Sequence, residues 1–262
     1  MATRAADKMP VTSKAIVECT LWKAALKAAK TVAGKEAPYD VIQLRFDESA
    51  GQVIISAMNP RATFYVRLDA EILGVVADRD ELVEFPKTEV DALVHMPFAK
   101  VEAGEEVRVG INVSEDAIRV TDESGFGMGF HPHNSSFPRL LDKTPLGDAV
   151  RAVDTAKDDA TELGTRPVLP LYPQLDAIVK VHRSFGGRAR ITQVGDLNEG
   201  AGRILAHGIN WSMTVTASGE AKLETDKNAA EQLAVPTEIS FNGGDARPGV
   251  KVAKASPTEG IS

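Results

Sequence analysis

The sequence predicts an α+β fold in which antiparallel sheets carry helices on one face, with two domains per chain. Short runs of alternating apolar and polar residues recur along most of the chain, separated by hairpin-length connections that favour antiparallel strands. A few helical segments interrupt these strands, the longest at 21–33 and 173–185. The chain has 262 residues, and at roughly 100–200 residues per domain this length favours two domains.

Composition excludes several classes of protein. A single cysteine, Cys19, rules out an intramolecular disulfide framework and a cysteine-built zinc finger. No run approaches the ~20 apolar residues of a membrane span, and the first 14 residues lack the apolar core of a signal peptide. We therefore expect a cytoplasmic protein with no membrane partner. The net charge of −7 argues against a simple basic nucleic-acid binder.

The elements of the first half follow in order. Residues 1–12 are polar and are expected to form a flexible N-terminus. A strand at 15–19 leads into the helix at 21–33, with Thr20 as its predicted N-cap and Gly34 as its stop. Further strands are predicted at 39–47, 52–58, 63–68, 106–113, 117–121 and 125–130, and the segment 81–98 begins extended and turns at Pro86 into a short helix.

The second half repeats part of this pattern. Residues 146–156 have helical character, 166–171 are extended, and the amphipathic helix 173–185 stops at a glycine pair. Strands at 189–194 and 203–217 follow, the latter bending at Gly208. Strand, proline turn, short helix and further strands thus describe both 81–130 and 166–217. After Ser218 the hydrophobic density falls, so residues 219–262 are expected to be a polar, largely flexible C-terminal segment.

One helix face concentrates positive charge. Lys23, Lys27 and Lys30 fall within an arc of roughly 60° at about 100° per residue. Lysine binds phosphate without demanding one geometry, so this face could contact a DNA backbone. Lys180 and Arg183 give the second helix a weaker version of the same signal, and Asp176 is placed to pair with Lys180. The alternative for both helices is an ordinary solvated face.

The order of these features resembles the DNA sliding clamps, in particular the bacterial DNA polymerase III beta subunit and its phage relatives. The resemblance rests on LWKAALKAAKTVAGK, the hairpin LRFDESAGQVIISAMNP, TFYVRL, LVEFPKTEVDALVHM and EEVRVGINVSEDAIRVT. It ends at HNSSFPRL, where Phe137-Pro138-Arg139-Leu140 is similar to the end of the first clamp domain. The resemblance implies a clamp-like domain at 13–141 and a shortened or diverged second clamp-like domain at 142–218.

The resemblance also implies a function. Clamps form a ring of six similar domains around duplex DNA, with helices lining the channel, and tether the replicative polymerase. The implied partners are duplex DNA bound without sequence specificity, a DNA polymerase and a clamp loader. With two domains per chain the ring would be a homotrimer, which this length favours, and a dimer stays open. The alternative is a clamp-fold adaptor or decoy that binds a polymerase or host clamp without encircling DNA.

Partners of clamps insert a short peptide with apolar side chains into a surface groove. By position, the resemblance points to two groups of residues in the second half. These residues could equally be ordinary core. They are Val168, Leu169, Leu171, Met213 and Val215.

No catalytic constellation is found in the sequence, so no enzyme activity, metal or cofactor is expected. The pair His131 and His133 flanks a proline and has no third ligand nearby. A GxGxG at 125–129 precedes no helix, which argues against a phosphate-binding loop. Cys19 lies in a predicted strand, where a buried thiol is the expected role.

Overall fold

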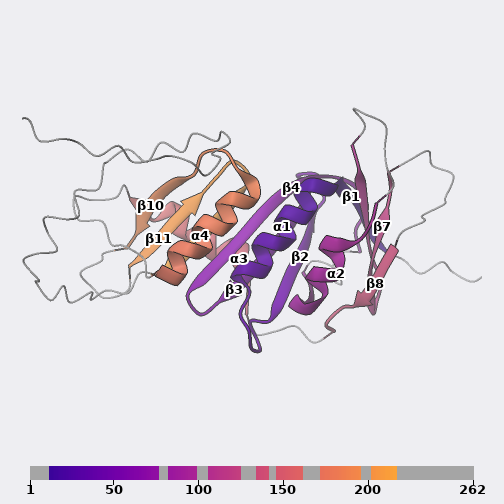
Figure 1. Ribbon diagram of the computed structural model, residues 1–262, viewed down its shortest axis with the longest axis horizontal. Helices are drawn as coiled ribbons and strands as arrows, with labels where there is room; N and C mark the ends of the chain where they lie inside the picture. Colours follow the sequence, from indigo (N-terminus) through magenta and orange to yellow (C-terminus); the bar gives the residue numbers. More distant parts are fainter. Residues whose placement is uncertain are drawn as a thin grey trace, which may run out of the picture. The chain divides into compact units, whose positions relative to one another are not determined.

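The computed structural model describes residues 12–76, 82–98, 106–124, 134–141, 146–161, 172–195 and 202–216 (Figure 1). In chain order the elements are β1 (Ser13–Glu18), α1 (Cys19–Val32), β2 (Val41–Asp47), β3 (Gln52–Asn59), β4 (Ala62–Gly74), β5 (Val83–Pro86), the short 3₁₀ turn η1 (Lys87–Glu89), α2 (Val90–His95), β6 (Arg108–Val113), β7 (Ala117–Asp122), β8 (Asn134–Pro138), α3 (Ala149–Asp158), β9 (Ala160–Thr161), α4 (Tyr172–Phe185), β10 (Arg190–Val194), β11 (Arg203–His207) and β12 (Trp211–Thr216).

One local order of elements occurs three times. A strand, a helix and three strands follow one another in β1–α1–β2–β3–β4, in β5–α2–β6–β7–β8 and in β9–α4–β10–β11–β12. The repeated pattern predicted for 81–130 and 166–217 corresponds to the second and third of these units. The strand predicted at 125–130 and the extended segment predicted at 166–171 lie outside the described residues.

The strands pair antiparallel throughout, in the order β8-β7-β6-β1-β4-β12-β11-β10-β9, with β5-β2-β3 joining β4 through β3. Strand β4 is shared: Ala62 to Val66 pair with β12, and Ala70 to Gly74 pair with β1. Strands from both predicted domains therefore meet along β4, and the described residues belong to one compact unit, Met1–Ala221. The division into domains at 141/142 stays a prediction.

Helices cover both faces of the sheet around β3 and β4. Because side chains alternate along a strand, Phe64 and Val66 enter the large core beneath α1, α2 and α4, whereas Tyr65 enters a smaller core beneath α3. The prediction of helices on one face holds for α1, α2 and α4 and is wrong for α3. The physical reason is that Ile54, Tyr65 and Leu205 give the opposite face its own apolar surface, on which α3 packs. Below, the α1 side is called the inner face and the α3 side the outer face.

Helix α1 begins two residues earlier than predicted. The side chain of Glu18, rather than Thr20, caps it by accepting hydrogen bonds from the backbone N–H of Thr20 (2.6 Å) and Leu21 (2.7 Å). A carboxylate suits this position because helix N-termini favour negative charge. At the other end, the Lys87 ammonium donates to the carbonyls of Ala33 (2.6 Å) and Gly34 (3.1 Å). Both ends of the helix are thus satisfied by side chains.

Two further segments refine the predictions. The segment 203–217 does not bend as one strand: it forms two strands, β11 and β12, joined by a tight turn at 208–210. Gly208 is required in this turn because a Cβ there would lie 2.3 Å from Nε1 of Trp211. The motif that resembles the end of a clamp domain forms β8, where Phe137 packs on Phe85 with ring centroids 5.2 Å apart. Residues 219–262 and all but the last residue of the predicted N-terminal segment lie outside the described part of the chain.

Candidate nucleic-acid interface

Helices α1 and α4 lie side by side on the inner face (Figure 1). Alanines and a few large side chains of α1 are buried against the sheet and against α4, among them Trp22, Leu26 and Ala29. On α4, Ile178 and Val181 are buried in the same core. The polar sides of both helices therefore point away from the sheet. This arrangement places the five predicted DNA-binding cations on the two helices of one face.

Two of the three lysines on α1 turn toward the region of α2. The Lys23 ammonium donates to the carbonyl of Met96 at 3.2 Å and lies 4.6 Å from the centre of the Phe98 ring. Lys30 forms an ion pair with Asp91 of α2 at 2.5 Å. These contacts connect α1 to the segment 91–98. Lys23 and Lys30 therefore contribute to packing between α1 and the α2 region as well as to surface charge.

Lys27 and Arg183 are the cations that remain directed at solvent. Both residues are exposed, and within the described ranges neither side chain has an ion-pair partner. On α4, Lys180 pairs with Asp176 at 2.6 Å, as its spacing in the sequence predicted. Of the five cations, Lys27 and Arg183 are thus the most available to an external phosphate.

Only two of the five residues of the predicted peptide groove lie in the described part of the chain. Val168, Leu169 and Leu171 lie outside the described residues. Met213 and Val215 are 0% and 1% exposed, respectively, and belong to the inner core. Their alternation with Ser212 and Thr214 along β12 turns them toward α4. These two residues therefore play the core role that the sequence left as the alternative.

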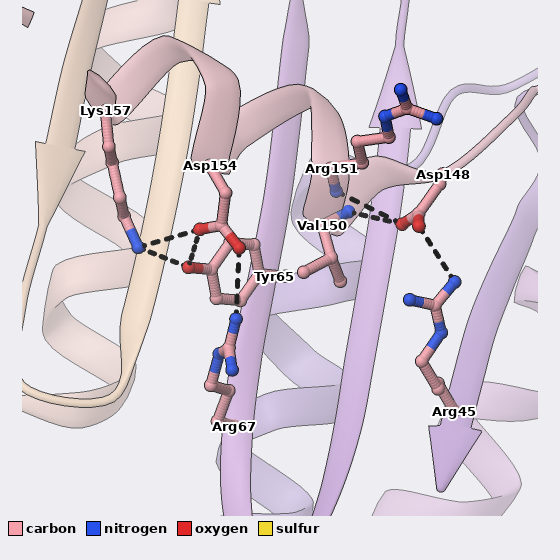
Figure 2. A network of polar contacts seen from close by, with 8 residues as sticks. All are labelled: Arg45, Tyr65, Arg67, Asp148, Val150, Arg151, Asp154 and Lys157. Atoms are coloured by element: carbon pink, nitrogen blue, oxygen red, sulfur yellow. Dashed lines mark hydrogen bonds and ion pairs between the residues drawn. The ribbon is translucent and has the colours of Figure 1, made fainter. Parts of the chain in front are cut away.

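The outer face carries a polar cluster that the sequence did not indicate (Figure 2). Asp154 of α3 accepts a hydrogen bond from the hydroxyl of Tyr65 at 2.6 Å and pairs with Arg67 and with Lys157, each at 3.1 Å. Lys157 also contacts the Tyr65 hydroxyl. Burial opposes ionisation of Asp154, but the hydrogen bonds from Tyr65 and Lys157 outweigh it and hold the pKa of this carboxyl below its usual value.

A second acidic side chain fixes the start of α3. Asp148 accepts hydrogen bonds from the backbone N–H of Val150 (2.9 Å) and Arg151 (3.2 Å), which makes it the N-cap (Figure 2). Its other oxygen pairs with Arg45 of β2 at 2.9 Å. Local sequence signals for this outer cluster are an aspartate before a helical segment and the spacing of Asp154 and Lys157, whereas Arg45 and Arg67 come from strands about 100 residues earlier.

The described residues show no arrangement typical of metal binding or nucleophilic catalysis. Within the described ranges no group of three His, Cys, Asp or Glu side chains is arranged to hold a metal. His131, His133 and the glycines at 125–129 lie outside those ranges. Cys19 is buried, and burial raises the pKa of its thiol, which disfavours a nucleophilic thiolate. Among the described helices, none combines the length and the apolar character needed to cross a membrane.

No family model and no curated protein matches the sequence. Solved structures do match. A putative DNA polymerase III beta subunit from Eubacterium rectale aligns over 82% of this chain and 67% of its own, with a TM-score of 0.52 at 9% identity. A DNA polymerase sliding clamp from Pseudomonas aeruginosa aligns over 82% and 70%, with a TM-score of 0.52 at 12% identity.

The DNA polymerase III beta subunit of Thermotoga maritima gives a similar result, with 79% of this chain and 65% of that one covered and a TM-score of 0.51 at 11% identity. The chain thus spans about two thirds of the length of these clamps (65–70%). The three matches agree with the resemblance noted in the sequence. The chain has the fold of the DNA polymerase III beta-subunit sliding clamps.

Proposed function

We propose that this protein is a sliding-clamp-like processivity factor that encircles duplex DNA as a ring and tethers a replicative polymerase. The observation that carries the proposal is the placement of α1 and α4 side by side on the inner face, with Lys27 and Arg183 exposed on it. In the clamp fold this is the face that surrounds DNA. The protein would act by binding and not by catalysis, in the cytoplasm, together with a polymerase and a clamp loader.

A sliding tether needs weak contacts. Each neutralised phosphate of duplex DNA contributes a log–log salt slope of roughly −0.9, so a few cations per chain, multiplied by the symmetry of a ring, hold DNA without fixing its position. Lysine and arginine on helices that contact only the backbone carry no sequence information. The overall charge of −7 is compatible with this role, because net charge is an average over the surface and Lys27 and Arg183 are both exposed on the inner face.

We propose a trimer as the assembly. Two clamp-like domains in each of three copies would supply the six domains of a ring.

Light scattering with the full chain at micromolar concentration is the first test. A trimer is the expected result, and a dimer would still allow a ring. A strict monomer would contradict the ring. It would leave the adaptor or decoy as the function, which one observation favours: Lys23, Lys30 and Lys180 already bind groups within the chain.

Retention on DNA tests the inner face. The protein is incubated with nicked circular duplex DNA in the presence of a clamp loader, freed of unbound protein by gel filtration, and cut with a restriction enzyme. A ring stays on the circle and is released when the circle is cut, whereas ordinary binding survives cutting. The double variant Lys27→Glu with Arg183→Glu should retain several-fold less protein and show a shallower salt dependence.

The matched control is Arg151→Glu with Arg203→Glu. These residues are exposed and lie on the outer side, on α3 and β11, and their reversal changes the net charge by the same amount. Retention should stay at the level of the unmodified protein. Equal losses in both double variants would mean that net charge alone governs retention, which would contradict the assignment of the inner face.

A further inference from the structure

The junction between β4 and β12 is the place where the two predicted domains meet. Five consecutive residues of each strand pair there, from Trp211 with Val66 to Val215 with Ala62. Two more backbone hydrogen bonds extend the pairing, from Arg67 N–H to the carbonyl of Asn210 and from Thr216 N–H to the carbonyl of Arg61, each 2.8 Å. A sheet joined by one pair of strands can still bend along that line, since backbone bonds resist separation more than rotation.

Helix α3 crosses this line on the outer face. It packs on β3 and β4 on one side of the junction and on β12 on the other. Its buried residues Val150, Val153 and Ala156 share one core with residues from both sides. From the first repeated unit come Ile54 and Tyr65, and from the third come Val194 and Leu205. With α1 and α4 on the inner face, the junction has helices on both sides.

Asp154 is the polar anchor of α3 on β4. Its carboxylate receives the Tyr65 hydroxyl and the Arg67 guanidinium from the strand, and the Lys157 ammonium from its own helix (Figure 2). Tyr65 is 2% exposed, and its hydroxyl finds its acceptor in Asp154 and a further contact in Lys157 at the edge of the outer core. Both cations also lie near the face of the Tyr65 ring, with Arg67 at 5.1 Å and Lys157 at 4.8 Å from its centre.

We propose that α3 is a brace that fixes the angle of the sheet at the β4–β12 junction, and that Asp154 is the positioning residue that holds it. The consequence rests on the proposed function: the angle at this junction sets how α1 and α4, and therefore Lys27 and Arg183, face DNA. Three partners meeting at one carboxylate act as a unit, so loss of the carboxylate releases all of them together.

Hydrogen exchange of the full chain tests the brace without DNA. In Asp154→Ala the amides of β12 should exchange about tenfold faster than in the unmodified protein, because local opening of the junction becomes easier. The amides of β6 and β7, which lie far along the sheet path, should not change. Asp154→Asn keeps an acceptor for Tyr65 but loses both ion pairs. Its β12 amides should therefore exchange at a rate between those of the unmodified protein and of Asp154→Ala.

The control variant is Arg151→Ala, on the exposed side of the same helix, which should leave exchange at β12 unchanged. An Asp154→Glu variant, which restores the charge, should recover part of the protection. Unchanged exchange at β12 in Asp154→Ala would overturn the brace. So would an equal increase in β6, β7 and β12, since Asp154 would then be a general stabilising residue.

Retention on nicked circular DNA separates this proposal from the proposed function. If the unmodified protein is retained topologically, Asp154→Ala should lower retention several-fold with Lys27 and Arg183 intact. Faster exchange at β12 with undiminished retention would overturn the link between the junction and DNA. If the unmodified protein itself fails to be retained, the proposed function fails, and the exchange result alone decides whether α3 braces the junction.

Discussion

The inner and outer faces of the same sheet are covered in different ways. On the inner face, Phe64 and Val66 of β4 enter a large apolar core, and the charged groups of α1 and α4 remain at the rim or in solvent. On the outer face, the intervening residues Tyr65 and Arg67 meet α3 through charge and hydrogen bonds. Four consecutive residues of one strand thus serve two kinds of packing: apolar burial on the inner face, and apolar burial combined with polar contacts on the outer face.

The difference between the two faces shows which cations are available to a partner. The outer cations Arg45, Arg67 and Lys157 are held by carboxylates of the α3 region. On the inner face Lys27 and Arg183 have no such partner within the described ranges. On the inner face, Asp91 and Asp176 pair with Lys30 and Lys180 only, so Lys27 and Arg183 stay available to an external phosphate. Net charge per chain cannot reveal this distribution.

The largest expected effect on stability comes from creating a cavity by the same substitution in the core of each face. Val181 of α4 and Val153 of α3 are both 0% exposed, and each is changed to Ala. Val181→Ala should lower the free energy of unfolding by about 2 kcal/mol, and Val153→Ala by about 1 kcal/mol, because the thin outer core can relax around the cavity. Urea unfolding followed by circular dichroism measures both. Equal losses would mean that the two faces are packed equally tightly.

Acid should loosen the outer face through Asp154. The pKa of its carboxyl is lower in the folded protein than the ordinary value of about 3.9, so the ionised form stabilises the fold above that value. This stabilisation is lost as the pH falls through the lowered pKa. We expect a contribution of about 0.5–1 kcal/mol at neutral pH. Stability measured from pH 6 to pH 2 should therefore fall less steeply in Asp154→Asn, and identical profiles would contradict the assignment.

The smallest effects compare two ion pairs by double-mutant cycles. The pair of Asp176 and Lys180 is an isolated i,i+4 pair on α4 and should show a coupling of about 0.3 kcal/mol that disappears in high salt. The pair of Arg67 and Asp154 shares its carboxylate with Tyr65 and Lys157 and should show about 1 kcal/mol. Equal couplings would mean that the outer cluster is no more than a set of surface pairs.

Local patterns in the sequence predicted most of the strands and both long helices. The hairpin of β2 and β3 and that of β6 and β7 follow from alternation around short turns, and α1 and α4 follow from helical spacing. The cap of α1 was missed, because threonine is a favoured N-cap residue type and glutamate is not, so only the backbone geometry shows that Glu18 takes this role. The apolar pattern of 203–217 predicted one strand with a bend at Gly208, because this pattern does not show that residues 208–210 form a tight turn between two strands.

The candidate site was predicted less well, for a physical reason. Helical spacing places Lys23, Lys27 and Lys30 on one side of α1, but it does not say what stands beside them. Met96 and Asp91 come from a segment about 70 residues away and engage two of the three lysines. Lys180 was different, since its partner Asp176 lies within the same helix and was visible in the sequence. The placement of α3 likewise depends on strands distant in the chain.

The sharing of β4 has a consequence for how the chain is made. Its partner β12 is synthesised about 150 residues after it, since Thr63 pairs with Thr214. At 5–20 residues per second a ribosome needs roughly 8–30 s to cover that distance. During this interval the part of β4 that pairs with β12, Ala62 to Val66, has N–H and C=O groups open to pairing with any other strand, including that of a neighbouring nascent copy. The yield of correctly paired protein should therefore depend on how crowded the translating ribosomes are.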